Sequence, residues 1–400
     1  MRRVAIEPRS DWKAKLEAVG ISYHTLKGAG YPAEWQGREV WNESAYYALS
    51  LGEVLELEKA TDALHEMCLE VVDRVVAQRL WERVGVDAAY AALIEESWKA
   101  DHPSVYGRFD LVYGGRESGR APKLLEYNAD TPTSLIEAAV AQWFWYQEVF
   151  PKERFPRHDQ FNSIHEKLIE AWGRVLTRCP SEEPLTFTAV GHADEDVATA
   201  CYLMDTACQA GHATQFVPIE KIGVRHSSGQ FVDERGRRIK NVFKLYPYEW
   251  MFDEEFGKTM LTAAARWIEP AWKVILSSKG MLALLSEMFP NSPYLLRATA
   301  EEPKWEHVRK PFFSREGANI AVRGGGRGGD GSLDGAVETP GPYGAPYVYQ
   351  ALAKMPRFDG KWMVVGSWVI DGESAGIGIR EDDSAILNNA SAFVPHVIEK

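Results

Sequence analysis

The sequence predicts a mixed fold of the α+β or α/β class, in which a helical and α/β front precedes a β-rich C-terminal lobe. Three observations support this prediction. Residues 43–99 contain few helix breakers and repeat apolar residues at i, i+3 and i+4, which is typical of helices. Strand-like apolar runs then alternate with helical patterns over residues 106–290. Beyond about residue 305, short alternating runs are joined by Asp-Gly turns, as in antiparallel β structure.

Size and charge limit the classes of function. A chain of 400 residues exceeds one ordinary core, so we expect two or three domains with interleaved segments. The hydrophobic fraction of 45% supports a large core and excludes wholesale disorder. With a net charge of −12 and no run of Lys or Arg, nucleic acid is not an expected partner. An acidic surface would suit a small cationic substrate, although most acidic proteins are merely soluble.

The cysteines and the N-terminus indicate a cytoplasmic location. No cysteine lies in a C-x-x-C pair or at zinc-ligand spacing from a histidine, so reduced core thiols are expected. The four are Cys68, Cys179, Cys201 and Cys208. The basic N-terminus lacks the apolar stretch of a signal peptide, and no run approaches the roughly 18–20 apolar residues of a membrane span. A membrane is therefore not an expected partner.

A hairpin and a helix are predicted in the first α/β stretch. "GRFDLVYGG" (107–115) and "PKLLEYNAD" (122–130) alternate like strands, and the turn-rich link between them predicts an antiparallel hairpin. A helix is expected to follow over 134–150, where Ser134 and Glu137 have the spacing of a capping box.

The middle of the chain continues with a strand and a helix. "PLTFTAVG" (184–191) is an apolar run typical of a buried strand. The helical pattern after it begins with Asp194 as a candidate N-cap and ends at Gly211. Further along, the patterns predict a strand region over 214–224, a second hairpin over 229–246 and helices over 258–289.

The first hairpin carries a polar patch suited to a metal ion. Because side chains alternate along a strand, Arg108 and Asp110 share one face of the first strand, and Glu126 and Asn128 share one face of the second. Two carboxylates and an amide oxygen suit Mg²⁺, and an adjacent arginine suits phosphate oxygens. The predicted helix start near 131–134 would add N–H groups that favour an anion. A solvated hairpin face beside an ordinary helix cap explains the same spacing equally well.

A second candidate is a lysine followed by a loop. Lys310 and Pro311 follow an alternating stretch, and residues 314–318 form a small-residue loop that could close over phosphates. Taken alone, this segment is explained more simply by a surface lysine before a turn.

Two further segments have simple structural explanations. Gly324, Gly326 and Gly329 formally satisfy G-x-G-x-x-G, but no strand-to-helix unit with a downstream acidic residue accompanies them, which favours a loop. The acidic trio 194–196 is typical of helix capping and dipole complementation, with a carboxylate pocket for an amine as the alternative. No G-x-S-x-G sequence or activated cysteine marks a nucleophile.

Seven stretches, taken in order, resemble the synthetase domain of glutathionylspermidine synthase and its relatives, an ATP-grasp family of carboxylate–amine ligases. They are "GRFDLVY", "LLEYNADTPTSL", "FKLYPYEWM", "IEPAWKVILSSKGMLALLSEMFP", "RKPFFSREGANI", "YVYQALA" and "GIGIREDDSAIL". The resemblance covers nearly the whole chain and implies an ATP-grasp fold with a preceding pre-ATP-grasp region. Because "GRFD" arrives by residue 107, it points to the stand-alone synthetase-like branch without the amidase domain.

The same resemblance implies a division of the chain. Residues 1–105 would be a largely helical N-terminal region. Residues 106–300 would be the pre-ATP-grasp substrate region, which carries the metal-site hairpin. Residues 301–400 would be the nucleotide-binding ATP-grasp lobe, with the domains interleaved.

The resemblance also implies roles for individual residues. Arg108 would be catalytic and would stabilise the transferring phosphoryl group, while Asp110, Glu126 and Asn128 would bind Mg²⁺. Residues 350–353 would border the adenine, and residues 385–387 would line the nucleotide pocket. The implied ATP-binding residues are Arg108, Lys310, Gln350, Ala351, Leu352, Ala353, Arg380, Ala385, Ile386 and Leu387. The implied substrate-binding residues are Thr131, Glu195, Asp196 and Trp250.

The chain departs from the family pattern on the substrate side. Thr131 and Thr133 stand in place of two serines, and Trp250 stands where a threonine touches glutathione. Ala392 falls near the acidic residue that receives the polyamine. The glycine-rich stretch 324–331 replaces a longer sequence, so one further ATP-contacting lysine is not placed. The identities of the acid and the amine therefore stay open.

The predicted function is an ATP-dependent carboxylate–amine ligase that forms an amide through an acylphosphate, with ATP and Mg²⁺ as cofactors. The expected substrates are a small carboxylic acid, such as the peptide glutathione, and an amine, such as a polyamine. The alternative is a catalytically silent module that binds ATP or senses polyamine. The intact set of candidate metal and phosphate residues argues against that alternative.

Overall fold

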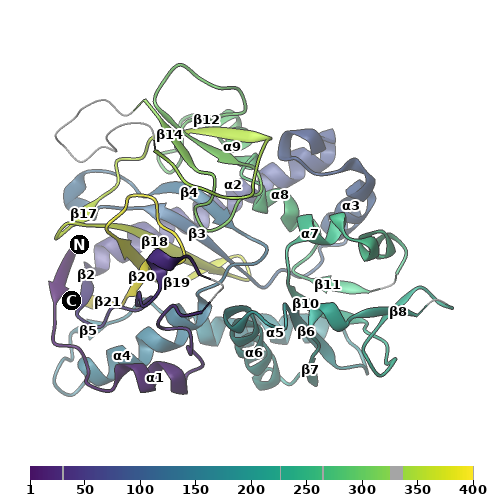
Figure 1. Cartoon of the computed structure of the whole chain (residues 1–400), viewed down its shortest axis with the longest axis horizontal. Helices are drawn as coiled ribbons and strands as arrows, with labels where there is room; N and C mark the ends of the chain where they lie inside the picture. Colours follow the sequence, from purple (N-terminus) through teal and green to yellow (C-terminus); the bar gives the residue numbers. More distant parts are fainter. Residues whose placement is uncertain (29–30, 226, 264, 325–336, 400) are drawn as a thin grey trace.

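The computed structural model describes residues 1–400 apart from 29–30, 226, 264, 325–336 and 400. The described residues form five sheets with helices packed on them, which confirms the predicted mixed α/β class. In Figure 1 an antiparallel sheet lies at the centre, a parallel sheet with its helices lies at the lower right, and a small sheet lies at the top.

The central sheet combines segments that are far apart in the sequence. Its strand order is β20-β19-β18-β3-β4, with every neighbouring pair antiparallel. Residues of β18 enter two cores, since Val365 packs with helix α2 (Leu51–Gln78) and Trp368 packs with α5 (Ile164–Arg178). The strands are β3 (Tyr106–Val112), β4 (Lys123–Asn128), β17 (Arg357–Phe358), β18 (Lys361–Ile370), β19 (Glu373–Asp382) and β20 (Ala392–Val394).

The parallel sheet has the strand order β11-β10-β6-β7. Its two inner strands are buried along their whole length, as expected for parallel strands beneath helices. Helix α6 (Asp194–Gln209) packs on β6 and β7 and against α5. The strands are β6 (Leu185–Ala189), β7 (Thr214–Phe216), β10 (Asn241–Leu245) and β11 (Arg266–Ile268).

Three smaller sheets complete the described fold. One has the order β1-β2-β21-β5 and brings the two chain ends together, as Figure 1 shows. The second has the order β12-β16-β13-β14-β15, and β13 at its centre carries Lys310. The strands are β1 (Arg2–Ala5), β2 (Ala45–Ser50), β5 (His158–Asp159), β21 (His396–Glu399), β12 (Ala298–Thr299), β13 (His307–Pro311), β14 (Ala321–Arg323), β15 (Val337–Glu338), β16 (Tyr347–Ala351) and the separate pair β8 (Gly223–Arg225) and β9 (Gln230–Val232).

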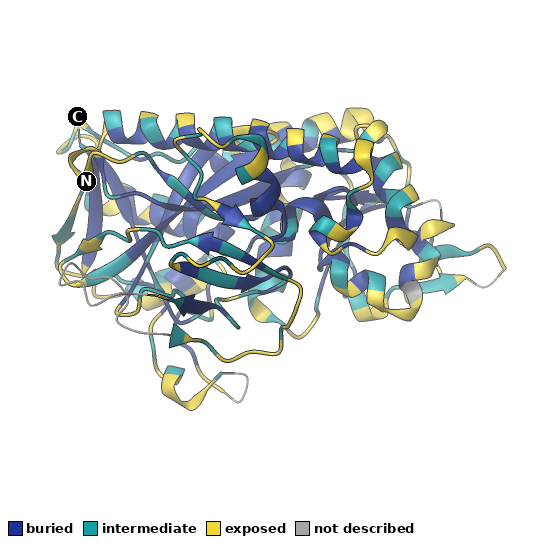
Figure 2. Ribbon diagram, turned by 90° about the horizontal axis from the view of Figure 1, so that it is seen from above, coloured by how far each residue is buried: buried dark blue, intermediate teal, exposed yellow. Residues whose placement is uncertain are grey.

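Helix α2 shows how local sequence sets an element. Ser50 and Glu53 form a capping box, with Glu53 N donating to Ser50 Oγ at 3.3 Å and Ser50 N donating to Glu53 Oε2 at 2.8 Å. Its apolar stripe is buried while the opposite face is exposed, which is visible in the long helix of Figure 2. The remaining α-helices are α1 (Trp12–Ala18), α3 (Ala91–Lys99), α4 (Gln142–Val149), α7 (Tyr248–Asp253), α8 (Lys273–Ser277) and α9 (Met281–Met288). No helix within the described ranges has the length and apolar character to cross a membrane.

The predicted N-caps of two helices are wrong, although both helices begin within one residue of the predicted position. Ser134 has a φ of 69°, whereas an N-cap residue is extended, so it forms no capping box. Instead Glu137–Ala141 form a π-helical turn that leads into α4. At α6 the N-cap is Ala193 rather than Asp194, and no side chain caps this helix. Gly211, with a φ of 98°, does follow the end of α6 as predicted.

The hairpin predicted over 229–246 is confirmed only at its turn, where Val232 forms an antiparallel bridge with Arg238 and Ile239 N donates to the Phe231 carbonyl. Strand β9 pairs with β8, and β10 enters the parallel sheet beside β6. The predicted strand region over 214–224 is confirmed in part, since β7 and the start of β8 lie there. The physical reason is burial: β10 is covered on both faces, which a peripheral hairpin does not provide.

Two helical predictions and one cysteine prediction hold only in part. Strand β2 precedes α2 within 43–99, and β11 interrupts the region 258–289. All four cysteines are free, and Cys68 and Cys179 are buried, but Cys208 is exposed rather than a core thiol.

The sheets join segments from all three predicted regions. Strands β3 and β4 lie beside β18, and β2 lies beside β21. The boundaries near residues 105 and 300 themselves stay a prediction.

Candidate active site

The polar patch of the first hairpin lies inside a sheet. Arg108 stands opposite Asn128 and Asp110 opposite Glu126, as the alternation of the two strands predicts. Strand β18 pairs with the other edge of β3, and the Arg108 and Asp110 side chains on this sheet are only 7% and 5% exposed. The alternative of a solvated hairpin face is therefore wrong.

Two arginines converge on Asp110. Arg108 Nε donates to Asp110 Oδ1 at 2.8 Å, and Arg380 Nη2 lies 3.4 Å from Asp110 Oδ2. Arg108 Nη1 also donates to the Thr133 carbonyl at 2.6 Å. Gly366 on β18 leaves the room for this arrangement, because a Cβ there would lie 2.9 Å from Arg108 Cδ. The structure thus fixes two guanidinium groups side by side.

A cavity of ≈ 230 Å³ opens between the central sheet and the sheet that contains β13. Its lining contains every residue that was predicted to bind metal or ATP, together with Thr131. The predicted residues in the lining are Arg108, Asp110, Glu126, Asn128, Thr131, Lys310, Gln350, Ala351, Leu352, Ala353, Arg380, Ala385, Ile386 and Leu387. The structure brings these residues together from β3, β4, β13, β16, β19 and the 385–389 segment, while their roles stay proposals.

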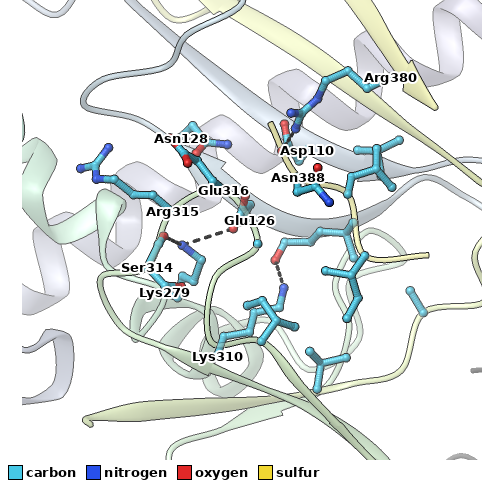
Figure 3. Close-up of a pocket in the computed structure, with 18 of the residues that line it drawn as sticks. Asp110, Glu126, Asn128, Lys279, Lys310, Ser314, Arg315, Glu316, Arg380 and Asn388 are labelled. Atoms are coloured by element: carbon cyan, nitrogen blue, oxygen red, sulfur yellow. Dashed lines mark hydrogen bonds and ion pairs between the residues drawn. The ribbon is translucent and has the colours of Figure 1, made fainter. Parts of the chain in front are cut away.

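Two lysines reach the floor of the cavity (Figure 3). Lys310 Nζ donates to the Leu125 carbonyl at 2.9 Å and to Gln350 Oε1 at 2.8 Å. Lys279 Nζ lies 3.3 Å from Glu126 Oε2 and donates to the Ser314 carbonyl at 2.5 Å. Lys310 was predicted, and its alternative as a surface lysine is wrong because it is buried.

The charged side chains of the cavity shift one another's pKa values. Burial alone would raise the pKa of Glu126, but the charges of Lys279 and Lys310 lower that pKa to about 2. Burial lowers the pKa of Lys310 to about 8, with Glu126 opposing and Lys279 reinforcing the shift. Burial likewise lowers the pKa of Arg380, although Asp110 opposes it. Glu126 therefore stays ionised at neutral pH.

The loop after Lys310 joins the cavity to the predicted substrate residues. Arg315 donates to Thr131 Oγ1 at 2.9 Å and to Glu249 Oε1 at 2.6 Å, and its guanidinium lies 5.3 Å from the centre of the Trp250 ring. Gly317 has a φ of 71°, and a Cβ there would lie 2.6 Å from the Leu387 carbonyl oxygen. The loop thus packs directly against the 385–389 segment. Trp250 is 40% exposed and stands at the edge of this group, outside the cavity lining.

Glu195 and Asp196 lie in the first turn of α6, near the cavity but outside its lining. Burial, with the nearby carboxylates of Glu137 and Asp196, raises the pKa of Glu195 to about 8. Burial also raises the pKa of Asp196 to about 6, against the charge of Arg315. Helix capping does not explain two neighbouring acids whose surroundings disfavour their charged forms.

The predicted metal ligands all offer oxygen atoms, but they differ in their hydrogen bonding. Among the described residues, no three His, Cys, Asp or Glu side chains are grouped to hold a metal ion, and the predicted set supplies two carboxylates and one amide. Asp110 and Glu126 face each other across the ladder, and Asn128 Nδ2 is buried without a hydrogen-bond partner. A rotated Asn128 amide would direct its oxygen to the same place, so this donor set fits Mg²⁺.

Sequence reasoning missed several residues of the site. Lys279, Arg315, Glu316 and Asn388 line the cavity without having been assigned a role (Figure 3). A signal existed for Lys279, since a lone lysine within the apolar run "VILSSKGMLALL" must be buried with a partner. The glycine-rich stretch 324–331 lies almost entirely outside the described residues.

The glutathionylspermidine synthase preATP-grasp family matches residues 3–399. The chain belongs to this family. The resemblance inferred from the seven sequence stretches is thereby confirmed.

The chain matches several named relatives, and the share of each relative's length that it spans differs. A Haemophilus influenzae protein named "Putative acid--amine ligase" is 37% identical, over 99% of both chains. Trypanothione synthetase of Crithidia fasciculata is 26% identical over 80% of this chain, and the bifunctional glutathionylspermidine synthetase/amidase of Escherichia coli is 25% identical over 89%. The chain spans only 49% and 59% of the length of these last two.

A solved structure shares the fold. A glutathione synthetase-like effector from Globodera pallida, in its apo form, matches with a TM-score of 0.55 over 97% of this chain and 96% of its own. At 9% identity this similarity concerns the fold alone.

Proposed function

We propose that this member of the family is an ATP-dependent carboxylate–amine ligase with an ATP-grasp fold, which forms an amide through an acylphosphate. The observation that carries the proposal is the cavity, in which five cationic side chains lie around the two carboxylates and the amide of the candidate metal site. Such a set suits phosphoryl transfer, where positioning and charge neutralisation supply most of the catalysis. The cationic residues are Arg108, Lys279, Lys310, Arg315 and Arg380.

Asp110, Glu126 and Asn128 would hold Mg²⁺, because they offer three oxygen donors at one end of the cavity. When bound, Mg²⁺ would neutralise charge on the phosphate oxygens. Residues 350–353 and 385–387 would border the nucleotide base, since they line the same cavity.

The chemistry would proceed in two balanced steps. A carboxylate oxygen of the acid would attack the γ-phosphorus of ATP, and the bond from that phosphorus to ADP would break. The amine nitrogen would then attack the acyl carbon, the bond from carbon to the phosphate oxygen would break, and a proton would leave the nitrogen. Arg108 and Arg380, fixed on Asp110, would stabilise the transferring phosphoryl group.

The acid and the amine would lie next to the end of the cavity at which Arg108 and Arg380 would bind phosphate. Thr131, Arg315 and Trp250 form one group there, and Glu195 and Asp196 form the other. Arg315 would attract the acid, and the two carboxylates would attract the amine. The proposed substrates are therefore a small carboxylic acid and a small amine, as the names of the relatives suggest.

The proposal is tested by amine-dependent phosphate release from ATP with Mg²⁺, screened over peptide acids and amines. We expect at least one pair to release phosphate, and Arg108→Ala to slow this release about 10³-fold with folding intact. Arg174→Ala, which removes a half-exposed arginine paired with Asp371, is the matched control and should leave the rate unchanged. Tight ATP binding without release by any pair would instead favour a silent ATP-binding or polyamine-sensing module.

A further inference from the structure

Glu137 is an exception among the buried carboxylates of this protein. It is 3% exposed, and its Oε2 atom has no hydrogen-bond partner within the described residues. Every other Asp or Glu that is comparably buried in the described ranges forms an ion pair, for example Glu43 with Arg9 and Glu381 with Arg3. A buried acid without a partner destabilises a protein, so this position calls for a function.

The surroundings of Glu137 are acidic and come from separate parts of the chain. The carboxylates of Glu195 and Asp196 on α6 and of Glu316 in the loop after β13 lie close by. The hydroxyl of Tyr23, from the N-terminal segment, lies beside the Glu137 carboxylate and is buried with no other partner among the described residues. None of these three other carboxylates takes part in an ion pair within the described residues. The positive charges that act on this group are those of Arg108 and Arg380 on Glu137 and of Arg315 on Asp196. Each of these arginines is paired with a carboxylate outside the group.

The backbone is built to place Glu137 there. Ser134 has a φ of 69°, which turns the chain sharply after β4, and Glu137 then opens a π-helical turn. Such turns are rare and occur frequently at functional sites. Thr133, just before this turn, lines the cavity and hydrogen-bonds Glu195. The acidic group therefore adjoins the phosphate end of the cavity.

The electrostatics agree with this geometry. Burial raises the pKa of Glu137, and burial with the charge of Glu137 raises the pKa of Glu195. Burial and the same two acids raise the pKa of Tyr23 well above its usual value. An added cation would reverse these shifts, because it would favour the ionised carboxylates.

We propose that Glu137 and Glu195, with the hydroxyl of Tyr23, form the inner end of the amine-binding site and take an ammonium group between them. This inference rests on the proposed ligase function for its link to catalysis, but the binding itself does not. An ammonium group supplies three donors, which match two carboxylates and a hydroxyl oxygen. Glu137 is then a binding residue, and Tyr23 sets how far an amine can extend inward.

The test measures amine binding to the full chain directly, by calorimetry at pH 7 without ATP. The probes are n-butylamine, 1,4-diaminobutane and spermidine. We expect at least one probe to bind, Glu137→Gln to weaken its binding about tenfold or more, and Tyr23→Phe to weaken it about 2- to 10-fold. ATP affinity should be the same in all three proteins.

Glu43→Gln is the matched control, because it makes the same change at a buried glutamate that is paired with Arg9 outside the cavity lining. We expect it to lower the melting temperature without changing amine binding, and Glu137→Gln to leave the melting temperature the same or higher. Equal amine affinity in the native chain and Glu137→Gln, or no binding of any probe to the native chain, would overturn the inference. Amine binding could depend on Glu137 while no amine releases phosphate from ATP. This result would support the amine subsite and overturn the ligase function.

Discussion

Asp110 determines how the two arginines of the cavity are arranged. It accepts from Arg108 on one oxygen and lies near Arg380 on the other, while its strand neighbour across the ladder is Glu126. A single carboxylate thereby holds two guanidinium groups that would otherwise repel each other. Their spacing is therefore a property of the folded chain, and phosphate oxygens would meet groups that are already in place.

The lowered pKa of Lys310 predicts that ATP affinity depends on pH. Burial lowers the pKa of Lys310 to about 8, so its positive charge is present below that pH and is lost as the pH rises through it. We expect the ATP affinity of the native chain to fall about tenfold between pH 7.5 and 9.5. Calorimetric titration of ATP at constant Mg²⁺ across this range measures the effect.

Lys310→Arg provides the comparison, because a guanidinium stays charged over the whole range. Its ATP affinity should change little between pH 7.5 and 9.5. The same loss of affinity in both proteins would show that another group is responsible.

At the scale of elements, a buried ion pair joins the metal-site hairpin to the parallel sheet. Asp130, just after β4, pairs with Lys244 on β10, and these side chains are 1% and 0% exposed. Asp130 Oδ2 also accepts from the backbone N–H of Tyr248 at 3.1 Å, and Lys244 Nζ lies 3.8 Å from the Tyr248 ring centre. The segment that carries Thr131 is therefore anchored from the sheet behind it.

Removing one partner of this pair should be costly. We expect Lys244→Met to lower the free energy of unfolding by about 3–5 kcal/mol, because Asp130 would stay buried without a counter-charge. Urea denaturation measures this, and the double variant Asp130→Asn/Lys244→Met should recover much of the loss. Lys221→Met breaks the exposed pair with Glu234 and should cost less than about 1 kcal/mol. Similar losses in Lys244→Met and Lys221→Met would contradict this account.

Elements that depend on residues near one another in the sequence could be predicted from it. Elements that depend on contacts with distant segments could not. The shared face of Arg108, Asp110, Glu126 and Asn128 follows from alternation along two neighbouring strands. The hairpin expected over 229–246 forms only near its turn and does not include β10, because the partner of β10 is β6, more than fifty residues earlier in the chain. The unusual φ of Ser134 likewise depends on contacts that a capping-box pattern does not contain.

For the whole molecule, the candidate site depends on strands that meet only after folding. The predicted metal and nucleotide residues share one cavity, although they come from residues 108–128 and 310–387. Lys279, Arg315 and Glu137 were missed because their significance lies in their partners, or in the lack of one, and partners are not visible in a sequence. The family resemblance assigned roles only to residues that lie in a matching motif.

The central claim, ligation through an acylphosphate in this cavity, is tested most directly by the nucleotide products of an active acid and amine pair. The account predicts one ADP and one phosphate for each amide formed, with both substrates required and with loss of ADP formation in Glu126→Ala. Formation of AMP and pyrophosphate, or ADP release that ignores acid and amine, would contradict it.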